Sequence, residues 1–321
     1  MRMNSRDEKA GVAAGQFAAV VLLLVAVWLV YLRVTFHSLT RFMAVIDTCP
    51  LTFCDFANHY LPMGRHVFDR TGPVPGFLYT PFFALLVALV AQLSDTGAVI
   101  AWGVAQVGLT ILLLVVPRRL VRRPGLAAAA LYVFLFLSAF PVLHNFKWGQ
   151  ISVLVTLCVL GSLALWQRGH AVVAGFLLAF ATSIKFYPAW FALALLLRRD
   201  WRALSAYAVF CALFLVAVPA VALGPHATLQ FYLDVLAQLR VRADGMLNDV
   251  NSQSLEGLLT RLCYSAGSPW PTSLSLFEPV RWGVLAVALP SVWLSLRRAK
   301  GGEMRAFLIL FCALPFVTPT S

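Results

Sequence analysis

The chain has 321 residues, of which 61% are hydrophobic and 12% charged, and its mean hydropathy is +0.84. Soluble domains carry about 25% charged residues and about 45–50% apolar ones. This composition excludes soluble, disordered and small disulfide-stapled proteins and predicts an all-α polytopic membrane protein. The formal net charge of +12 does not predict a nucleic-acid partner, because basic residues also set membrane topology.

Apolar runs recur along the whole chain, and a membrane-crossing helix needs about 20 such residues. The first run, Ala13–Tyr31, follows three basic residues, Arg2, Arg6 and Lys9. It is therefore predicted to be a retained span with the amino terminus in the cytoplasm. The later runs are Ala98–Val116, Leu126–Val142, Ile151–Trp166, Ala171–Leu197, Ala203–Leu223, Trp282–Leu296 and Ala306–Val317.

Two further segments need interpretation. Lys185 and Pro188 lie near the middle of Ala171–Leu197, where a charge is costly and proline breaks the helical hydrogen bonds. We therefore predict two short spans that turn at the outer surface near Lys185; one long kinked helix is the alternative. Pro81–Leu93 is too short to cross the bilayer and is predicted to be a helix at the outer interface.

These choices give a single membrane domain over residues 1–321 with about nine spans. Arginine clusters such as Arg118–Arg123 and Arg198–Arg202 then fall on the cytoplasmic side, as basic residues usually do. Two long loops, Arg33–Gly97 and Gly224–Arg281, fall on the outer side and are predicted to carry interfacial helices. We expect a multi-pass protein of a bacterial inner or plasma membrane, with its chemistry on the outer loops.

The first outer loop contains a candidate carboxylate, Asp55. Phe56, Tyr60 and Met63 follow it at helical spacing, so one interpretation makes Asp55 the cap of a short interfacial helix. Its place near the outer membrane face, among several basic residues, also permits a catalytic role. Cys49 and Cys54 share this loop and could form a disulfide in an oxidising compartment.

Three further polar segments are predicted at the outer face. Lys147, Trp148 and Gln150 follow the third span, where lysine and tryptophan are ordinary interfacial anchors. Lys185 lies in an otherwise apolar turn and needs an anionic partner, either a lipid phosphate or an acidic residue of a neighbouring loop. The second loop contains Asn251-Ser252-Gln253-Ser254-Leu255, which is typical of a helix start.

Together these segments resemble glycosyltransferase family 87, which belongs to the C-type membrane glycosyltransferase superfamily. The family's motifs, in order, are Asp-Phe-x-x-Tyr, aromatic-Tyr-Pro-Pro, Gly-Gln, Lys-x-x-Pro and Asn-Gln-Ser-Leu. Here they correspond to Asp55–Tyr60, Phe77–Pro81, Gly149-Gln150, Lys185–Pro188 and Asn251–Leu255, with one tyrosine a residue late and one inserted residue. The resemblance spans about residues 50–320 and implies a C-type glycosyltransferase-like bundle.

The resemblance also implies an activity. Family members transfer a sugar, typically mannose, from a polyprenyl phosphate to an acceptor hydroxyl outside the cytoplasm, with inversion. The acceptor is expected to be a glycolipid or another glycan, and the surrounding partners are membrane lipids. The family's catalytic base maps to Asp55, with Asp47 as the second candidate. Cations and amides of the outer face are expected to bind phosphate or sugar: Lys185, Lys147, Gln150, Asn251, Gln253 and Arg261.

No metal-ligand spacing is present among the six histidines and six cysteines, so no metal or other cofactor is predicted. Thr318–Ser321 resembles an element that the family follows with tryptophan, a histidine pair and further spans. The domain is therefore expected to be short at its carboxyl end, and a truncated inactive remnant is one alternative function. The other alternative is a transporter or flippase of lipid-linked sugars.

Overall fold

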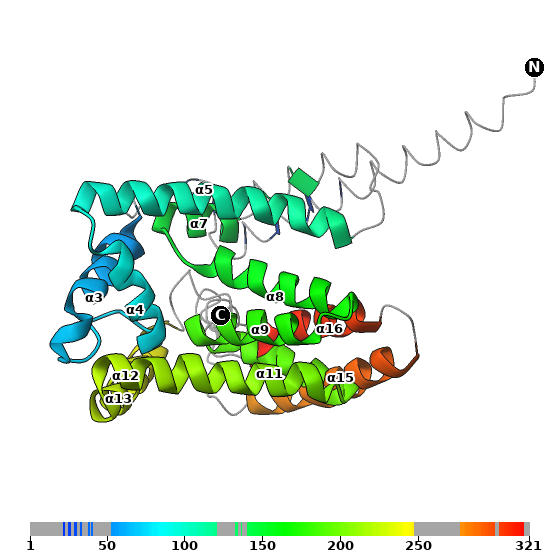
Figure 1. Cartoon of the computed structure of the whole chain (residues 1–321). Helices are drawn as coiled ribbons and strands as arrows, with labels where there is room; N and C mark the ends of the chain where they lie inside the picture. The colour runs from blue at the N-terminus through cyan, green and yellow to red at the C-terminus, as the bar shows by residue number, and fades with distance from the viewer. Residues whose placement is uncertain are drawn as a thin grey trace, which may run out of the picture.

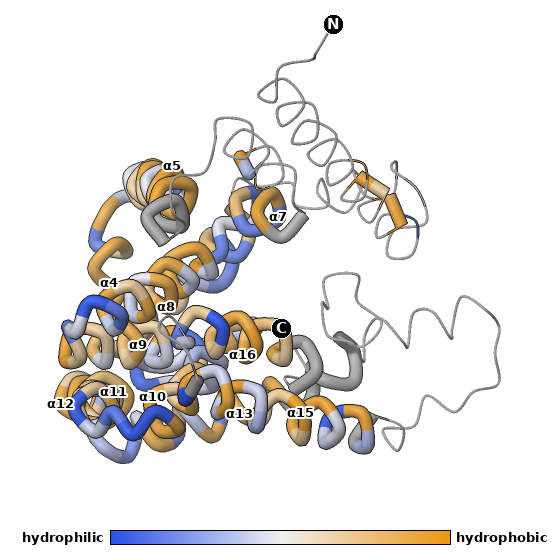
Figure 2. Tube along the Cα trace, turned by 90° about the vertical axis from the view of Figure 1, so that its right-hand side faces the viewer, coloured by the Kyte–Doolittle hydropathy of each residue, from blue (hydrophilic) through white to orange (hydrophobic). Residues whose placement is uncertain are grey.

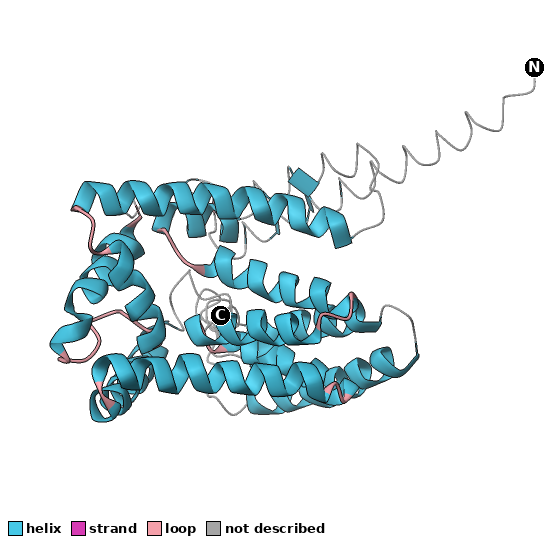
Figure 3. Ribbon diagram, viewed as in Figure 1, coloured by secondary structure: helices cyan, strands magenta, loops and turns pink. Residues whose placement is uncertain are grey.

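The computed structural model describes residues 53–120, 140–246, 277–298 and 302–317, with a few isolated positions elsewhere. Within these residues every regular element is helical, and no strand is present (Figure 3). This confirms the all-α class predicted from the composition. The predicted bundle of about nine spans extends into residues that are not described, so that number stays a prediction.

The first described helices come from the first predicted loop. They are η1 (Phe56–Tyr60), α3 (Leu61–His66), η2 (Val67–Asp69) and α4 (Pro81–Val90). α4 has 10 residues and begins at Pro81, after Thr80 caps it by accepting a hydrogen bond from the Phe83 amide at 3.2 Å. Proline is favoured at this first position because it needs no backbone donor there. The predicted short helix is thus present, and it is too short to cross a bilayer.

The remaining helices follow the apolar runs. They are α5 (Asp95–Leu120), α7 (Phe140–Trp148), α8 (Ser152–Gln167), α9 (Ala171–Ile184), η3 (Tyr187–Phe191), α10 (Ala192–Arg198), α11 (Trp201–Cys211), η4 (Ala212–Ala217), α12 (Val218–Leu223), α13 (Pro225–Met246), α15 (Phe277–Arg298) and α16 (Gly302–Val317). The predicted run Leu126–Val142 lies mostly outside the described residues. α13 occupies the start of the second predicted loop.

The bundle is built around α9, which packs between α8 and α11, while α5 covers α8 and α15 packs against α16. In Figure 1 these helices run roughly along one another, and α3, α4, α12 and α13 gather at one end. Gly175 allows the close contact of α9 with α11, because a Cβ there would lie 2.5 Å from the Ala203 carbonyl oxygen. The core is therefore formed by apolar side chains of the central helices.

The chain reverses direction at Lys185. Gly175, near the start of α9, packs against Ala203 near the start of α11. Further along both helices, the Tyr207 hydroxyl lies 3.4 Å from Thr182 Oγ1. α9 and α11 therefore run in the same direction, so η3 and α10 must return between them. This confirms the predicted turn near Lys185 and contradicts the alternative of one long kinked helix.

Three described helical segments are long and apolar enough to cross a membrane: Asp95–Val115, Trp201–Leu223 and Pro279–Arg297. Large apolar side chains on them are exposed, including Val104 (69%), Val209 (64%) and Val287 (69%). Figure 2 shows hydrophobic colouring on α5, on α11 and along much of α15. Such an exposed apolar surface is unfavourable in water and suits a lipid environment. The chain is an integral membrane protein.

Candidate functional site

Asp55 is presented by a short helical segment whose apolar side is fully packed. Phe56, Tyr60 and Met63 are each at most 1% exposed, as their helical spacing predicted. Asp55 itself precedes η1 and makes no capping hydrogen bond with its side chain. Its carboxylate instead accepts a hydrogen bond from another part of the chain. The capping interpretation of Asp55 is therefore wrong.

The donor to Asp55 is Gln150, whose Nε2 lies 2.8 Å from Asp55 Oδ2. Gln150 follows α7, which ends in a Schellman motif. The Gly149 amide bonds the Phe146 carbonyl at 3.2 Å, and the Gln150 amide bonds the Asn145 carbonyl at 2.9 Å. Gly149 has φ +67°, a left-handed conformation that glycine adopts without strain. The Gly-Gln pair thus combines a helix stop with a side chain directed at Asp55.

Lys185 lies at the reversal after α9. It is half-buried, and its ammonium donates a hydrogen bond to Ser152 Oγ at 2.9 Å. The Tyr79 ring lies beneath the ammonium, with Nζ 5.4 Å from the ring centroid, which is a cation–π distance. Lys185 is also close enough to Asp55 to feel its charge. Asp55 is thus a nearby acidic group of the first loop, whereas the direct hydrogen-bond partner of Lys185 is Ser152.

Burial and the nearby negative charge shift the pKa of Lys185 in opposite directions. Burial lowers the pKa of Lys185 to about 8, and the negative charge of Asp55 opposes this lowering. An ammonium loses hydration when it is buried, which favours the neutral amine, whereas a nearby carboxylate favours the charged form. Lys185 lies in the turn between α9 and η3, outside the candidate membrane spans.

Two tyrosines, Tyr60 and Tyr79, lie next to Asp55 and Lys185. The hydroxyls of Tyr60 and Tyr79 form a hydrogen bond, and the rings lie edge to face with centroids 5.0 Å apart. Burial raises the pKa of both phenols, so both stay neutral. Next to Tyr79, the Thr80 hydroxyl donates to the Ser183 carbonyl near the end of α9. The Tyr79-Thr80-Pro81 segment is thereby joined to the turn that carries Lys185.

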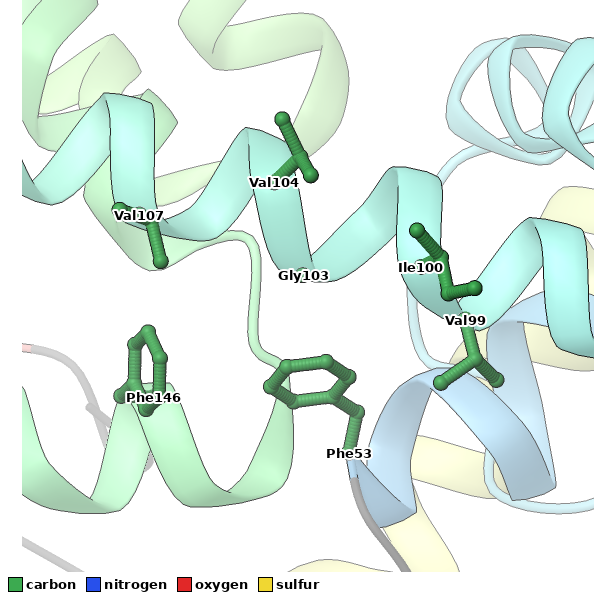
Figure 4. Close-up of a pocket in the computed structure, with 7 residues that line it drawn as sticks. All are labelled: Phe53, Val99, Ile100, Gly103, Val104, Val107 and Phe146. Carbon is green, nitrogen blue, oxygen red and sulfur yellow. The ribbon is translucent and has the colours of Figure 1, made fainter.

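An apolar cavity of about 520 Å³, open to the outside of the bundle, lies between α5 and α7. It is lined by Phe53, Val99, Ile100, Gly103, Val104, Val107 and Phe146. Figure 4 shows Val107 and Phe146 facing each other across it, with Phe53 at its lower edge. Phe53 precedes Asp55 by two residues, and Phe146 belongs to α7, which ends two residues before Gln150. Two residues of the cavity lining are therefore close in sequence to members of the polar cluster.

The remaining sequence-predicted residues are distributed differently. Lys147 lies in the last turn of α7 and is half-buried. Four candidates lie outside the described residues: Asp47, Asn251, Gln253 and Arg261. The structure thus brings together Asp55, Gln150 and Lys185. Cys54 is disulfide-bonded, and its predicted partner, Cys49, also lies outside the described part.

Sequence reasoning did not predict three residues that contact this cluster. Ser152 and Tyr79 contact Lys185, and Gln106 donates a hydrogen bond to the Gln150 carbonyl oxygen. Ser152 had no signal, because a serine at a helix start usually caps the helix. Gln106 did have one, since it is an amide within the apolar run Ala98–Val116. Among the described residues, no group of three or more histidine, cysteine or acidic side chains could hold a metal ion.

Comparison with known proteins identifies the family. The model of glycosyltransferase family 87 matches residues 77–319, which is most of the chain. The chain therefore belongs to glycosyltransferase family 87 and is a membrane glycosyltransferase. No curated protein and no solved structure matches it significantly. The matched range includes Gln150 and Lys185, while Asp55 precedes it and is connected to it by the contact with Gln150.

Proposed function

We propose that this member of glycosyltransferase family 87 transfers a hexose from a polyprenyl phosphate to an acceptor hydroxyl, with inversion. Mannose is the proposed sugar, and a glycolipid or another glycan on the outer face of the membrane is the proposed acceptor. The observation that carries the proposal is the meeting of Asp55, Gln150 and Lys185 from three distant segments. A carboxylate near a half-buried cation provides both groups that such a transfer needs.

Asp55 is the proposed base. The acceptor oxygen attacks the anomeric carbon as its proton passes to the Asp55 carboxylate. The bond from the anomeric carbon to the phosphate oxygen breaks, and the polyprenyl phosphate leaves with the electron pair. The hydrogen bond from Gln150, 2.8 Å long, holds the carboxylate in one orientation. Such fixed orientation is a large part of the rate gain in enzyme sites.

Lys185 is the proposed phosphate-binding group. Its ammonium has three donors, of which one contacts Ser152 at 2.9 Å. Negative charge grows on the departing phosphate as the bond breaks, and a partly buried cation stabilises it more strongly than one in water. The Tyr79 ring and the Ser152 hydroxyl hold the ammonium in place before donor binds.

The apolar cavity is the proposed site for the first isoprene units of the donor. Its described lining is entirely hydrophobic, and four of its residues (Ile100, Val104, Val107 and Phe146) are also exposed on the outside of the bundle. A lipid chain could therefore enter sideways from the bilayer. Its phosphate end would then lie toward Asp55 and Gln150, because Phe53 and Phe146 of the lining are close in sequence to these two residues.

The experiment that tests the function is transfer of radiolabelled mannose from polyprenyl-phosphate mannose by membranes that contain this chain. Asp55→Asn should abolish transfer, since asparagine can still accept from Gln150 but cannot take a proton. The protein should remain in the membrane at the wild-type level on immunoblots. Retained turnover in Asp55→Asn would remove Asp55 from the role of base.

A matched control is Asp95→Asn. Asp95 starts α5 and pairs with Arg65 at the surface, and its side chain is 75% exposed. Exposed ion pairs contribute about 0–1 kcal/mol, so this variant should keep its transfer activity. Equal loss in both variants would indicate a general effect of removing carboxylates rather than a role for Asp55.

A further inference from the structure

One amide is buried in the middle of a candidate membrane span. Gln106 belongs to α5 and is 1% exposed, while Val104 and Ile111 on the same helix are 69% and 54% exposed. The helix thus directs its apolar side outward and its amide inward. A buried amide is unfavourable unless it is hydrogen-bonded, so the contacts of Gln106 show what it serves.

Gln106 bonds the segment that carries Gln150. Gln106 Nε2 donates to the Gln150 carbonyl oxygen at 2.7 Å, and its Oε1 faces Asn145 Nδ2 at 3.4 Å. A carbonyl can only accept, so the Gln150 contact fixes which end of the Gln106 amide points to it. The other end must then accept from Asn145. Both polar ends of the Gln106 side chain are therefore hydrogen-bonded to the turn that ends α7.

A second residue of α5 holds the adjacent peptide. Trp102 Nε1 donates to the Gly149 carbonyl oxygen at 2.8 Å. Trp102 is one helical turn before Gln106, so both side chains lie on one face of α5. The Trp102 ring also stacks on Phe56, with centroids 4.5 Å apart and planes 13° apart. α5 therefore binds the carbonyls of two consecutive residues and contacts the helix that presents Asp55.

We infer that Gln106 is a positioning residue that holds the Gly149-Gln150 turn so that the Gln150 amide meets Asp55. This inference rests on the proposed function for its catalytic consequence, although the geometry it describes does not. Gln106 touches neither Asp55 nor any proposed substrate position. Its effect on transfer passes through Gln150, and Trp102 supports the same turn.

The first experiment measures the geometry without activity. Amide hydrogen exchange of the peptide over residues 145–152 is followed by mass spectrometry for the wild type and Gln106→Leu in lipid nanodiscs. The Gly149 and Gln150 amides are hydrogen-bonded in the closing turn, so Gln106→Leu should raise their exchange rate at least about 10-fold. Gln106→Met, which is unbranched, should do the same and serves if the leucine variant does not fold.

The matched control is Thr110→Val. Thr110 lies one turn further along α5 and its hydroxyl bonds only within the helix, to the Gln106 carbonyl at 2.7 Å. It should leave exchange over residues 145–152 and transfer activity unchanged. Unchanged exchange in both Gln106 variants would overturn the inference, whatever their activity.

The second experiment is a double-mutant cycle on transfer. Gln106→Leu should lower kcat by about 10-fold or more with little change in the KM of the donor. In a Gln150→Ala background, the same change should lower kcat by less than about 2-fold, because the side chain it positions is gone. Equal losses in both backgrounds would indicate a general structural role and overturn the inference. If the wild type transferred no sugar, the proposed function would fail, and the exchange result alone would decide the inference.

Discussion

Lys185 occupies an unusual position for a lysine, in a turn between apolar helices with its ammonium directed at Ser152. Burial lowers the pKa of Lys185 to about 8, and Asp55 limits the decrease. The charge of this residue therefore changes within a range that an enzyme assay can cover. Few lysines do so, because the ordinary pKa is about 10.4.

This leads to a prediction for the pH dependence of transfer. The ammonium loses its proton as the pH rises through about 8, so phosphate binding should weaken above that pH. A polyprenyl-phosphate sugar is a phosphodiester and keeps one negative charge over this range. We therefore expect kcat/KM for the donor to fall with increasing pH, with an apparent pKa near this value.

Lys185→Arg provides the test, because arginine stays protonated at every accessible pH. The alkaline decrease in kcat/KM should disappear in this variant, even where its maximal activity is lower. Arg168→Lys is the control, since Arg168 is exposed at the end of α8 opposite Ser152, and its profile should match the wild type. A decrease that persists unchanged in Lys185→Arg would assign it to another group.

At the end of α7, the backbone conformation and the close packing both require a glycine. Gly149 has φ +67°, and a Cβ at this position would lie 2.5 Å from Phe53 Cβ. Gly149→Ala should therefore destabilise the protein by about 1–2 kcal/mol from the left-handed backbone alone. The clash with Phe53 would add to this cost. The loss should appear as a lower thermal unfolding midpoint in detergent.

A glycine-to-alanine change within α5 should have the opposite effect on stability. Gly108 lies within α5, and an added Cβ there would meet nothing within 4 Å. Alanine in a helix interior is favoured over glycine by about 0.5–1 kcal/mol. Gly108→Ala should therefore raise the unfolding midpoint slightly. A decrease of equal size in both variants would contradict the special role of the Gly149 turn.

Filling the apolar cavity should weaken binding of the lipid part of the donor. Val107 of α5 faces Phe146 of α7 across the cavity (Figure 4), so Val107→Trp should fill it. KM should rise several-fold for a polyprenyl donor and stay unchanged for a sugar methyl phosphate donor, which carries no isoprene unit. Ile111→Trp, on the same helix but outside the cavity lining, should leave both KM values unchanged.

The boundaries of several elements could be predicted from simple chemistry. A lysine and a proline within an apolar run indicated the reversal between α9 and η3, and the spacing of Phe56, Tyr60 and Met63 indicated a packed helical side. α13 could not be identified in this way, because its sequence mixes polar and apolar residues without a clear apolar stripe. It contributes tertiary contacts instead: Gln238 accepts from the Gly76 amide at 3.0 Å.

For the molecule as a whole, the site combines segments that are far apart in the sequence. Asp55 and Gln150 are 95 residues apart, and Lys185 is 33 residues from Ser152. The sequence alone predicted Asp55, Gln150 and Lys185 in outer loops or turns. The family resemblance then suggested that these three residues act together. The contacts of Gln106 and Trp102 could not be predicted, because they depend on how α5 packs against the end of α7 rather than on any local pattern.

The length of α9 has a consequence for the lipids around the protein. α9 has 14 residues and is about 21 Å long at about 1.5 Å per residue, whereas the hydrocarbon core of a bilayer is about 30 Å thick. A short hydrophobic segment either thins the surrounding bilayer or leaves its polar end below the headgroups. Lys185 stands at that end, so a mismatch transmitted to α9 through the helices packed on it should displace the proposed phosphate-binding group.

Transfer should therefore depend on bilayer thickness. In vesicles of single-lipid composition, we expect higher rates in dimyristoleoyl phosphatidylcholine than in dierucoyl phosphatidylcholine, with the donor-to-lipid ratio held constant. Equal rates in the two lipids would show that neighbouring helices shield the short segment from the bilayer. Higher rates in the thinner bilayer would make acyl-chain length a physical variable of the reaction, in addition to the chemistry of donor and acceptor.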